Sequence, residues 1–392
     1  MSEWQAYRIA DLGQVITGRT PATNRPELLG NGTAFVTPTD ISEQSIYAEP
    51  QRRLSSTGDA EFRRVILPPD SVCFTCIASI GKMCLTSEPT LTNQQINSLI
   101  VDHSRVVPRW AFYALKAMRE EISAIASGAA TPIINKTSFG NIQLLVPPLE
   151  TQRRIASILG AYDDLIEVNR RRIAVLEEMA RGLFEEWFVR FRFPGHESVS
   201  IHDTQDGPLP EGWGFAPLDS FVVLQRGFDL PKSSRVDGDI PVYSASGFHG
   251  GHNEHKVNGP GLVTGRSGTI GQVHLVMENF WPLNTTLYVR EFRRAGPAYG
   301  LFLLRHMDLA KHSSGSAVPT LNRNHIHNIK LPAAPQSLID RFERFALANL
   351  QGSRIIELQN ERLVSSRDLL LPRLISGELS VAEAERELEE AA

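Results

Sequence analysis

The chain has 392 residues, 42% of them hydrophobic and 21% charged, which is typical of a globular protein with two to three domains. Its formal net charge of −4 argues weakly against a nucleic-acid partner. Residues 378–392 hold six Glu and one Arg, so the rest of the chain has 39 basic and 38 acidic residues. A phosphate-binding surface would therefore be a local patch.

The chain offers no targeting or membrane-spanning pattern. Its first residues, MSEWQAYRIADLG, lack a basic stretch followed by an apolar run, so we expect no signal peptide. No window approaches 18 uncharged apolar residues, so we expect no membrane span and a cytoplasmic protein.

Residues 1–148 contain short β-branched and aromatic runs broken by Gly, Pro, Asn and Ser, which predicts a sheet-rich domain with long loops. Cys73 and Cys76 form a C-x2-C pair, with Cys84 nearby. A structural zinc site needs four ligands, and no second pair or close histidine pair is present. We therefore expect buried, reduced thiols and no metal.

Residues 149–192 predict one long helix, because apolar side chains recur in alternating steps of four and three. Pro147-Pro148 precede the segment and Pro194-Gly195 follow it. About 42 residues make a rod of ~63 Å, which needs a partner helix of similar length to cover its apolar face. The positions of this heptad seam are Ile155, Leu159, Tyr162, Ile166, Asn169, Ile173, Leu176, Ala180, Leu183 and Trp187.

Residues 193–334 predict a second sheet-rich domain that repeats the first. SGAATPIINKTSFGNIQLLVPP, beginning at Ser127, matches SGSAVPTLNRNHIHNIKLPAAP at an offset of 187 residues, with Pro132 and Pro319 in register. Further upstream we align Asn97 with Asn284. The glycines of SIGKM and TIGQV, at 81 and 271, are three residues out of phase. A duplicated unit of roughly 190 residues accounts for these matches.

Residues 335–377 predict the second long helix, ended by Pro372 and Gly377. Adding 187 to the first seam gives positions that are polar about half the time, and the neighbouring Phe345, Leu350 and Ile355 could shift the apolar stripe by one. A pair of independent surface helices is the alternative to a coiled coil. The second seam is Phe342, Ala346, Asn349, Ser353, Ile356, Asn360, Leu363, Arg367, Leu370 and Leu374.

The predicted fold class is α+β: two duplicated sheet-rich domains separated by two long antiparallel coiled-coil helices, with pseudo-two-fold symmetry and an acidic tail over 378–392. The polar seam residues Asn169 and Asn360 weaken packing but help to fix its register. A two-fold protein suits a two-fold target, and duplex DNA is the commonest such target.

The sequence resembles the specificity subunit of type I restriction–modification enzymes over nearly the whole chain. PPLETQRRIASILGAYDDLIEVNRRRIAVLEEMARGLFEEWFVRF resembles that family's central conserved helix, and the segment with LLLPRLISGEL its C-terminal one. ILPPDSV, SIGKM and TNQQINSLI are similar to motifs inside its target recognition domains. One departure is QSLIDRFE in the second copy, where the first has ETQRRIAS.

The resemblance implies that residues 1–148 and 193–334 are target recognition domains, each reading one half of a split double-stranded DNA site. The two helices would set the distance between the halves and bind two methyltransferase subunits, which restriction/translocase subunits join. The departure falls in the segment that would make the second methyltransferase contact. S-adenosylmethionine, ATP and Mg²⁺ belong to the partner subunits, and this chain has no cofactor and no catalytic residue.

The residues support the lack of a catalytic centre. An Asn/Asp-Pro-Pro-Tyr/Phe motif and a Gly-x4-Gly-Lys-Ser/Thr loop are absent, and the glycine spacing of GRSGTIG favours two structural turns. His249, His252 and His255 recur at three-residue steps in a glycine-rich loop, which we interpret as solvated and DNA-facing rather than metal-binding.

Base reading requires hydrogen-bonding side chains on exposed loops. The competing interpretations are a duplicated coiled-coil scaffold without DNA recognition and a self-contained nuclease, and the latter is disfavoured by the missing carboxylate and lysine motif. The candidate DNA contacts are Arg19, Thr20, Thr39, Lys82, Gln94, Gln95, Asn135, Lys136, Arg226, Ser244, Ser246, His249, Arg266, Ser267, Asn322, Arg323 and Asn324.

Overall fold

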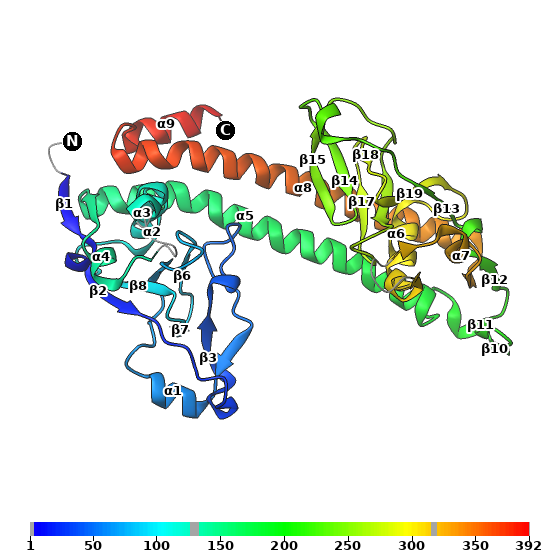
Figure 1. Cartoon of the computed structure of the whole chain (residues 1–392), viewed down its shortest axis with the longest axis horizontal. Coiled ribbons are helices and arrows are strands. Elements are labelled where there is room, and N and C mark those ends of the chain that lie inside the picture. The colour runs from blue at the N-terminus through cyan, green and yellow to red at the C-terminus, as the bar shows by residue number, and fades with distance from the viewer. Residues whose placement is uncertain (1–3, 126–132, 315–319, 392) are drawn as a thin grey trace. The chain divides into compact units, whose positions relative to one another are not determined.

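The computed structural model describes residues 4–125, 133–314 and 320–391 (Figure 1). They form two compact units, Met1–Asn169 with Gln359–Ala392, and Arg170–Leu358. Each unit takes in one sheet-rich domain and part of both long helices, whereas the sequence predicted the helices as separate segments. Pro132 and Pro319, which are in register in the repeated loop, lie outside the described residues.

The domain of the first unit is built on a four-stranded antiparallel sheet in the order β2-β8-β5-β6. A second sheet, β4-β3-β7, pairs β3 with β7 in parallel, and β1 pairs with β9. The bounds are β1 (Gln5–Arg8), β2 (Gly13–Thr17), β3 (Leu29–Val36), β4 (Arg52–Leu54), β5 (Val72–Thr75), β6 (Met83–Leu85), β7 (Thr90–Thr92), β8 (Ile96–Val101), β9 (Gln143–Val146), α1 (Ser56–Phe62), α2 (Pro108–Ala117), α3 (Arg119–Ile125) and α4 (Lys136–Gly140).

The domain of the second unit repeats this topology. Its four-stranded sheet is ordered β13-β19-β16-β17, its three-stranded sheet β15-β14-β18 has one parallel pair, and β12 pairs with β22. The bounds are β10 (Ile201–Thr204), β11 (Gly207–Pro210), β12 (Gly214–Pro217), β13 (Val222–Arg226), β14 (Ile240–Ser244), β15 (Gly247–His252), β16 (Gly261–Gly265), β17 (Val273–Val276), β18 (Trp281–Pro282), β19 (Thr286–Phe292), β20 (Ser313–Ser314), β21 (Thr320–Leu321), β22 (Lys330–Ala333), α6 (Pro297–His306) and α7 (Arg323–His327). The shared strand order confirms the duplication predicted from sequence.

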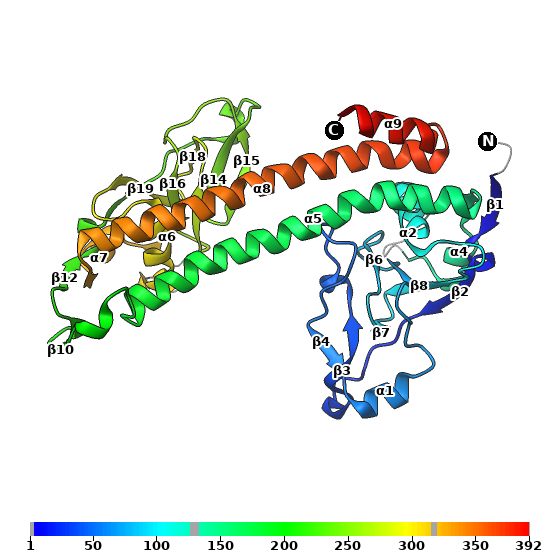
Figure 2. The ribbon, with the colours of Figure 1, turned by 180° about the vertical axis from the view of Figure 1, so that it is seen from behind.

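The two long helices are α5 (Leu149–Phe184), continued by a π-helical turn Glu185–Val189, and α8 (Gln336–Ser376). They run side by side in both views (Figure 1, Figure 2). In the first unit the amide of Asn169 donates to that of Asn360 at 2.9 Å. Asp163 pairs with Arg367 in the same unit, so the pairing there is antiparallel. In the second unit Trp187 packs edge-on against Phe342, and a Cβ added at Gly352 would lie 3.7 Å from Leu176, so the pairing is antiparallel there too.

The seam side chains face inward on both helices: none of the ten on α5 and none of the ten on α8 is exposed. Phe345 and Ile355, which could have shifted the second stripe, are 39% and 58% exposed. Two of the polar side chains at the second seam find partners across the helix pair: Asn360 bonds to Asn169, and Arg367 to Asp163. Ser353 instead donates to the Asn349 carbonyl of its own helix. The predicted pairing of the two helices is therefore confirmed, and the alternative of two independent surface helices is excluded.

Each domain joins the helices through a continuous core. In the first unit, Trp110 and Tyr113 of α2 are fully buried against Leu159 of α5 and Leu374 of α8. In the second, Phe184 of α5 contacts Tyr299 of α6 and other rings of an aromatic cluster. At 25 cal/mol per Å² of buried apolar area, each large ring adds roughly 2–3 kcal/mol, so the domains and helices are expected to unfold together.

The end of the chain is more helical than the sequence indicated, although the predicted helix end at Gly377 is confirmed. Helix α8 does not end at Pro372: it continues to Ser376, because the buried side chains of Leu371 and Leu374 on either side hold the last turn in place. Gly377, at φ +74°, ends it.

The predicted acidic tail, residues 378–392, is also mainly a helix, α9 (Val381–Ala391). Ser380 caps its first turn by exchanging hydrogen bonds with Glu383. Val381 and Ala384 are buried in the core of the first unit, and Arg154 of α5 pairs with Glu385. An apolar face on an acidic helix explains why this segment docks rather than stays solvated.

Cys73, Cys76 and Cys84 are buried free thiols. Among the described residues, no three His, Cys, Asp or Glu side chains gather as a metal ion would require. Within those same ranges, none of the helices has the length and apolar character needed to cross a membrane.

Candidate nucleic-acid interface

Four loops of the first domain meet beside its four-stranded sheet. The backbone amide of Arg19 donates to Thr92, that of Cys76 to Gln95, and that of Ile134 to Cys76, at 2.7–2.9 Å. We call residues 17–20, 76–82, 92–95 and 133–136 the first loop cluster. Candidate residues from four separate parts of the sequence are thereby held together.

The second domain builds the same arrangement with equivalent bonds. The backbone amide of Phe228 donates to Pro282, that of Arg266 to Thr285, and that of Leu321 to Arg266, each at 2.8 Å. Residues 226–229, 266–272, 282–285 and 320–324 form the second loop cluster. The structure therefore presents two copies of one loop scaffold with different side chains.

These bonds correct one alignment made from sequence. They make Thr285 the counterpart of Gln95, so the counterpart of Asn284 is Gln94 and not Asn97. Gly81 and Gly271, at φ +91° and +103°, share the same 190-residue offset. The sequence match was misleading because the copies change phase between this region and the repeated loop.

The candidates of the first domain are partly assembled. The hydroxyl of Thr20 hydrogen-bonds to the exposed Gln94 side chain, beside the exposed Arg19. Lys82 donates to the carbonyl of Pro38 at 3.2 Å, which places it next to Thr39. The loop that carries Thr39 joins the cluster because the amide of Asn93 donates to Val36.

Several candidates use their polar groups within the protein. Gln95 accepts a hydrogen bond from Asn93 at 2.9 Å. The side chain of Asn135 accepts from the Ser138 amide at 2.9 Å and caps α4, and Asn322 accepts from the Asn324 amide at 3.0 Å and caps α7. From the sequence we predicted that both asparagines read bases. In the structure their side-chain oxygens cap helices instead.

The residues after these caps, Lys136 and Arg323, are equivalent and exposed, as is Asn324. Lys136 is the first residue of α4, and Arg323 is the first residue of α7. The two loop clusters therefore have a positively charged side chain at the same position.

The candidates of the second domain lie in two groups. Arg266 reaches the carbonyl of Asn284 at 3.5 Å, beside the half-buried Ser267, and Arg226 lies 3.9 Å from Asp229. The other group is the hairpin of β14 and β15, where the hydroxyls of Ser244 and Ser246 lie 2.9 Å apart.

The hairpin of β14 and β15 adjoins the second loop cluster, since the amide of Ala245 donates to the Thr285 hydroxyl at 3.3 Å. His249 is exposed on β15, whereas His252 is buried against Trp281, so the histidines of this loop do not form one group. Sequence reasoning missed Phe248, an aromatic side chain that is 67% exposed on the same hairpin. Its position between Gly247 and Gly250 was the available signal.

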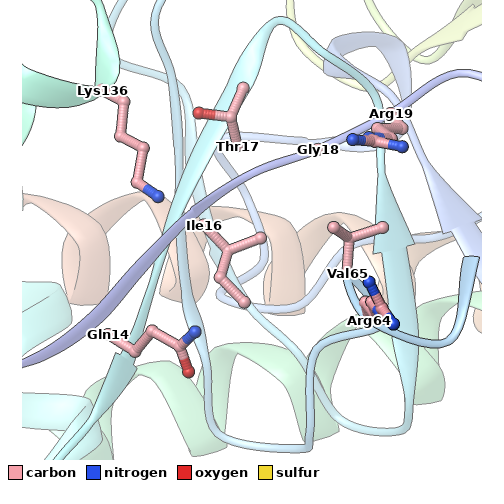
Figure 3. A pocket seen from close by; sticks show the side chains of 8 residues that line it. All are labelled: Gln14, Ile16, Thr17, Gly18, Arg19, Arg64, Val65 and Lys136. Atoms are coloured by element: carbon pink, nitrogen blue, oxygen red, sulfur yellow. The ribbon is translucent and has the colours of Figure 1, made fainter.

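A pocket of about 400 Å³ opens beside the first loop cluster. Figure 3 shows Arg19, Arg64 and Val65 along one side, Lys136 and Gln14 along the other, and Ile16 between them. Its remaining lining residues are Thr17 and Gly18. Sequence reasoning identified Arg19 and Lys136 but missed Arg64 and Gln14, although the Arg63-Arg64 pair was visible in FRRVILPPD.

Comparison with known proteins points to one family. Residues 1–178 match the family described as the type I restriction modification DNA specificity domain. The specificity subunit of the type I restriction enzyme MjaIX of Methanocaldococcus jannaschii is 26% identical, over 97% of this chain and 94% of that protein. The HindI specificity subunit of Haemophilus influenzae is 32% identical, over 40% of this chain and 35% of that protein.

The fold is shared with a solved structure, the S subunit of a type I restriction–modification system from M. genitalium. The two align with a TM-score of 0.59 and 17% identity, over 95% of this chain and 96% of that one.

Proposed function

Because the chain belongs to the specificity subunits of type I restriction–modification systems, we propose that it reads a bipartite double-stranded DNA site for such a complex. The observation that carries the proposal is the pair of loop clusters: one scaffold, built twice, with different hydrogen-bonding side chains at equivalent positions. Lys82 corresponds to Gln272, Gln94 to Asn284, and Lys136 to Arg323. Such differences are expected if the two half-sites differ in sequence.

The proposed role is recognition without catalysis. The motifs of an amino-methyltransferase and of a P-loop ATPase are absent from the sequence. We assign methylation to two methyltransferase subunits that bind the helix pair and use S-adenosylmethionine. Cleavage and translocation are assigned to restriction subunits that use ATP and Mg²⁺.

Domain replacement tests the proposal. Residues 1–145 are exchanged for those of a relative, with Arg109 and Tyr113 retained because they contact Asp164 and Asp163 of α5. The hybrid is produced with the methyltransferase subunit of the same system, and the methylated motif is read by sequencing. We expect one half-site to change and the other to stay.

The reciprocal exchange of residues 193–334 is the matched control, and it should change only the other half-site. If either hybrid altered both halves, the two domains would not be independent readers. If the parent complex showed no sequence preference, the chain would be a scaffold of the helix pair alone.

A further inference from the structure

We infer that the pocket beside the first loop cluster binds one phosphate of the DNA backbone, with Arg64 as a phosphate-positioning residue. The inference rests on the proposed DNA-reading function and deepens it. Phosphate contacts fix the register of a protein on the duplex, whereas base contacts supply specificity.

The lining of the pocket fits an anion. Arg19, Arg64 and Lys136 contribute three positive charges, and no Asp or Glu lines the pocket. The apolar side chains of Ile16 and Val65 lie between the cations (Figure 3).

The charged groups of Arg19, Arg64 and Lys136 are also available to bind a ligand. Within the described ranges, none of the three side chains forms an ion pair or a hydrogen bond with another residue. Two other arginines of the same domain are paired: Arg25 binds Glu61 at 2.7 Å and Arg53 binds Glu88 at 2.6 Å. Three free cations around one concavity repel one another, so an anion between them is stabilised by all three.

The position of the pocket relates it to base reading. Arg19 and Lys136 belong to both the pocket and the first loop cluster, where Gln94 and Thr20 are exposed. A phosphate held here would bring the adjoining bases to those side chains. Arg64 enters from the segment after α1, far away in sequence, and has no role in the cluster itself.

The second domain shows that the fold does not require an arginine at the position of Arg19. Its counterpart of Arg19 is Phe228, because both backbone amides donate to the equivalent strand position, Thr92 or Pro282. Phe228 is uncharged and packs against Trp281 and Tyr288. The arginine is therefore a feature of the first domain and not of the scaffold.

The test compares Arg64→Ala with Arg63→Ala, its exposed neighbour that does not line the pocket. Binding of the full chain, with its methyltransferase subunit, to duplex DNA containing its site is measured from 50 to 200 mM salt. We expect Arg64→Ala to bind about tenfold more weakly at low salt. The slope of log K against log salt should fall by ~0.9, the value for one phosphate. Arg63→Ala should match the parent, and Arg64→Lys should restore most of the slope.

A chemical arm locates the phosphate. Single methylphosphonate substitutions are placed along the DNA flanking the half-site, and one should weaken the parent complex without weakening Arg64→Ala further. Base preference should be the same in all variants, since a phosphate contact carries no sequence information.

The outcomes separate the inference from the proposed function. If the parent binds its site and Arg64→Ala behaves as Arg63→Ala does, the phosphate assignment is overturned while DNA reading stands. If the parent lacks sequence preference, DNA reading falls too. Inorganic phosphate is the probe for a free phosphoanion: stabilisation of the parent but not of Arg64→Ala, with an unchanged salt slope, would overturn the DNA assignment.

Discussion

The guanidinium of Arg367, on α8, donates a hydrogen bond to the carboxylate of Asp163, on α5, and the side chains are only 5% and 6% exposed. The hydroxyl of Tyr113, on α2, donates to the other carboxylate oxygen. Burial raises the pKa of the Tyr113 phenol, which therefore remains a donor. One buried carboxylate thus ties the first recognition domain to both long helices.

Removing that carboxylate should be costly. Asp163→Ala leaves the buried Tyr113 hydroxyl without its acceptor and Arg367 with only the exposed Asp368, at 2.8 Å. We expect a loss of about 3 kcal/mol in the free energy of unfolding, measured by urea denaturation. Asp164→Ala is the control: that carboxylate is 61% exposed, pairs with Arg109, and should cost under about 1 kcal/mol. Equal losses in the two variants would show that the buried network stabilises the protein no more than the exposed ion pair does.

The heptad seam predicts a contrast between near neighbours on α5. Ile173 faces the seam, whereas Val175 is 57% exposed. Ile173→Asp should lower the free energy of unfolding by ~2 kcal/mol or more, because a carboxylate there loses water without gaining a partner. Val175→Asp should change it little. The measurement is the thermal unfolding midpoint of each variant. Indistinguishable midpoints would contradict the assignment of Ile173 to the heptad seam.

A histidine of the second unit should make stability depend on pH. Nε2 of His327 accepts a hydrogen bond from the Leu224 amide at 2.9 Å, and burial lowers the pKa of this imidazole. Protonation therefore favours the unfolded chain. The stabilisation is complete above the unfolded pKa, about 6.5, and is lost as pH falls through the lower folded value.

The measurement is the unfolding midpoint between pH 7.5 and 5. We expect His327→Gln, which keeps an acceptor but does not titrate, to show a smaller fall in midpoint than the parent. His325→Gln, at an exposed position on the same helix, should follow the parent. A parent-like profile for His327→Gln would remove this histidine as the cause.

Capping and base reading by Asn135 make different predictions. Serine also caps helices, so Asn135→Ser should retain binding and half-site preference, whereas Asn135→Ala loses the bond to Ser138 and about 1 kcal/mol of local stability. The readout is binding to site variants at each base pair. If Ser and Ala relaxed preference at one adenine equally, Asn135 would be a base reader. Asn322→Ser repeats the test in the second copy.

Much of the candidate interface could be predicted because it lies in repeated loops. Arg19, Gln94 and Lys136 follow strands or turns that the sequence marks with Gly, Pro and Asn, and the structure brings them into one cluster. The roles of Asn135 and Gln95 could not be predicted, because their internal hydrogen bonds depend on backbone geometry. Arg64 was missed because nothing in its local sequence distinguishes it from Arg63.

The sequence by itself determined the two long helices and the duplication. Both are properties of spacing: apolar steps of four and three place side chains on one helix face, and a repeated order of turns and strands yields the same sheet twice. Only the tertiary structure decided which polar seam residues meet, such as Arg367 and Asp163, and that the acidic end docks as α9. It alone brought Arg64 to Lys136 across one pocket. Those contacts join residues far apart in the chain, and their energies depend on burial and on partners that no local pattern specifies.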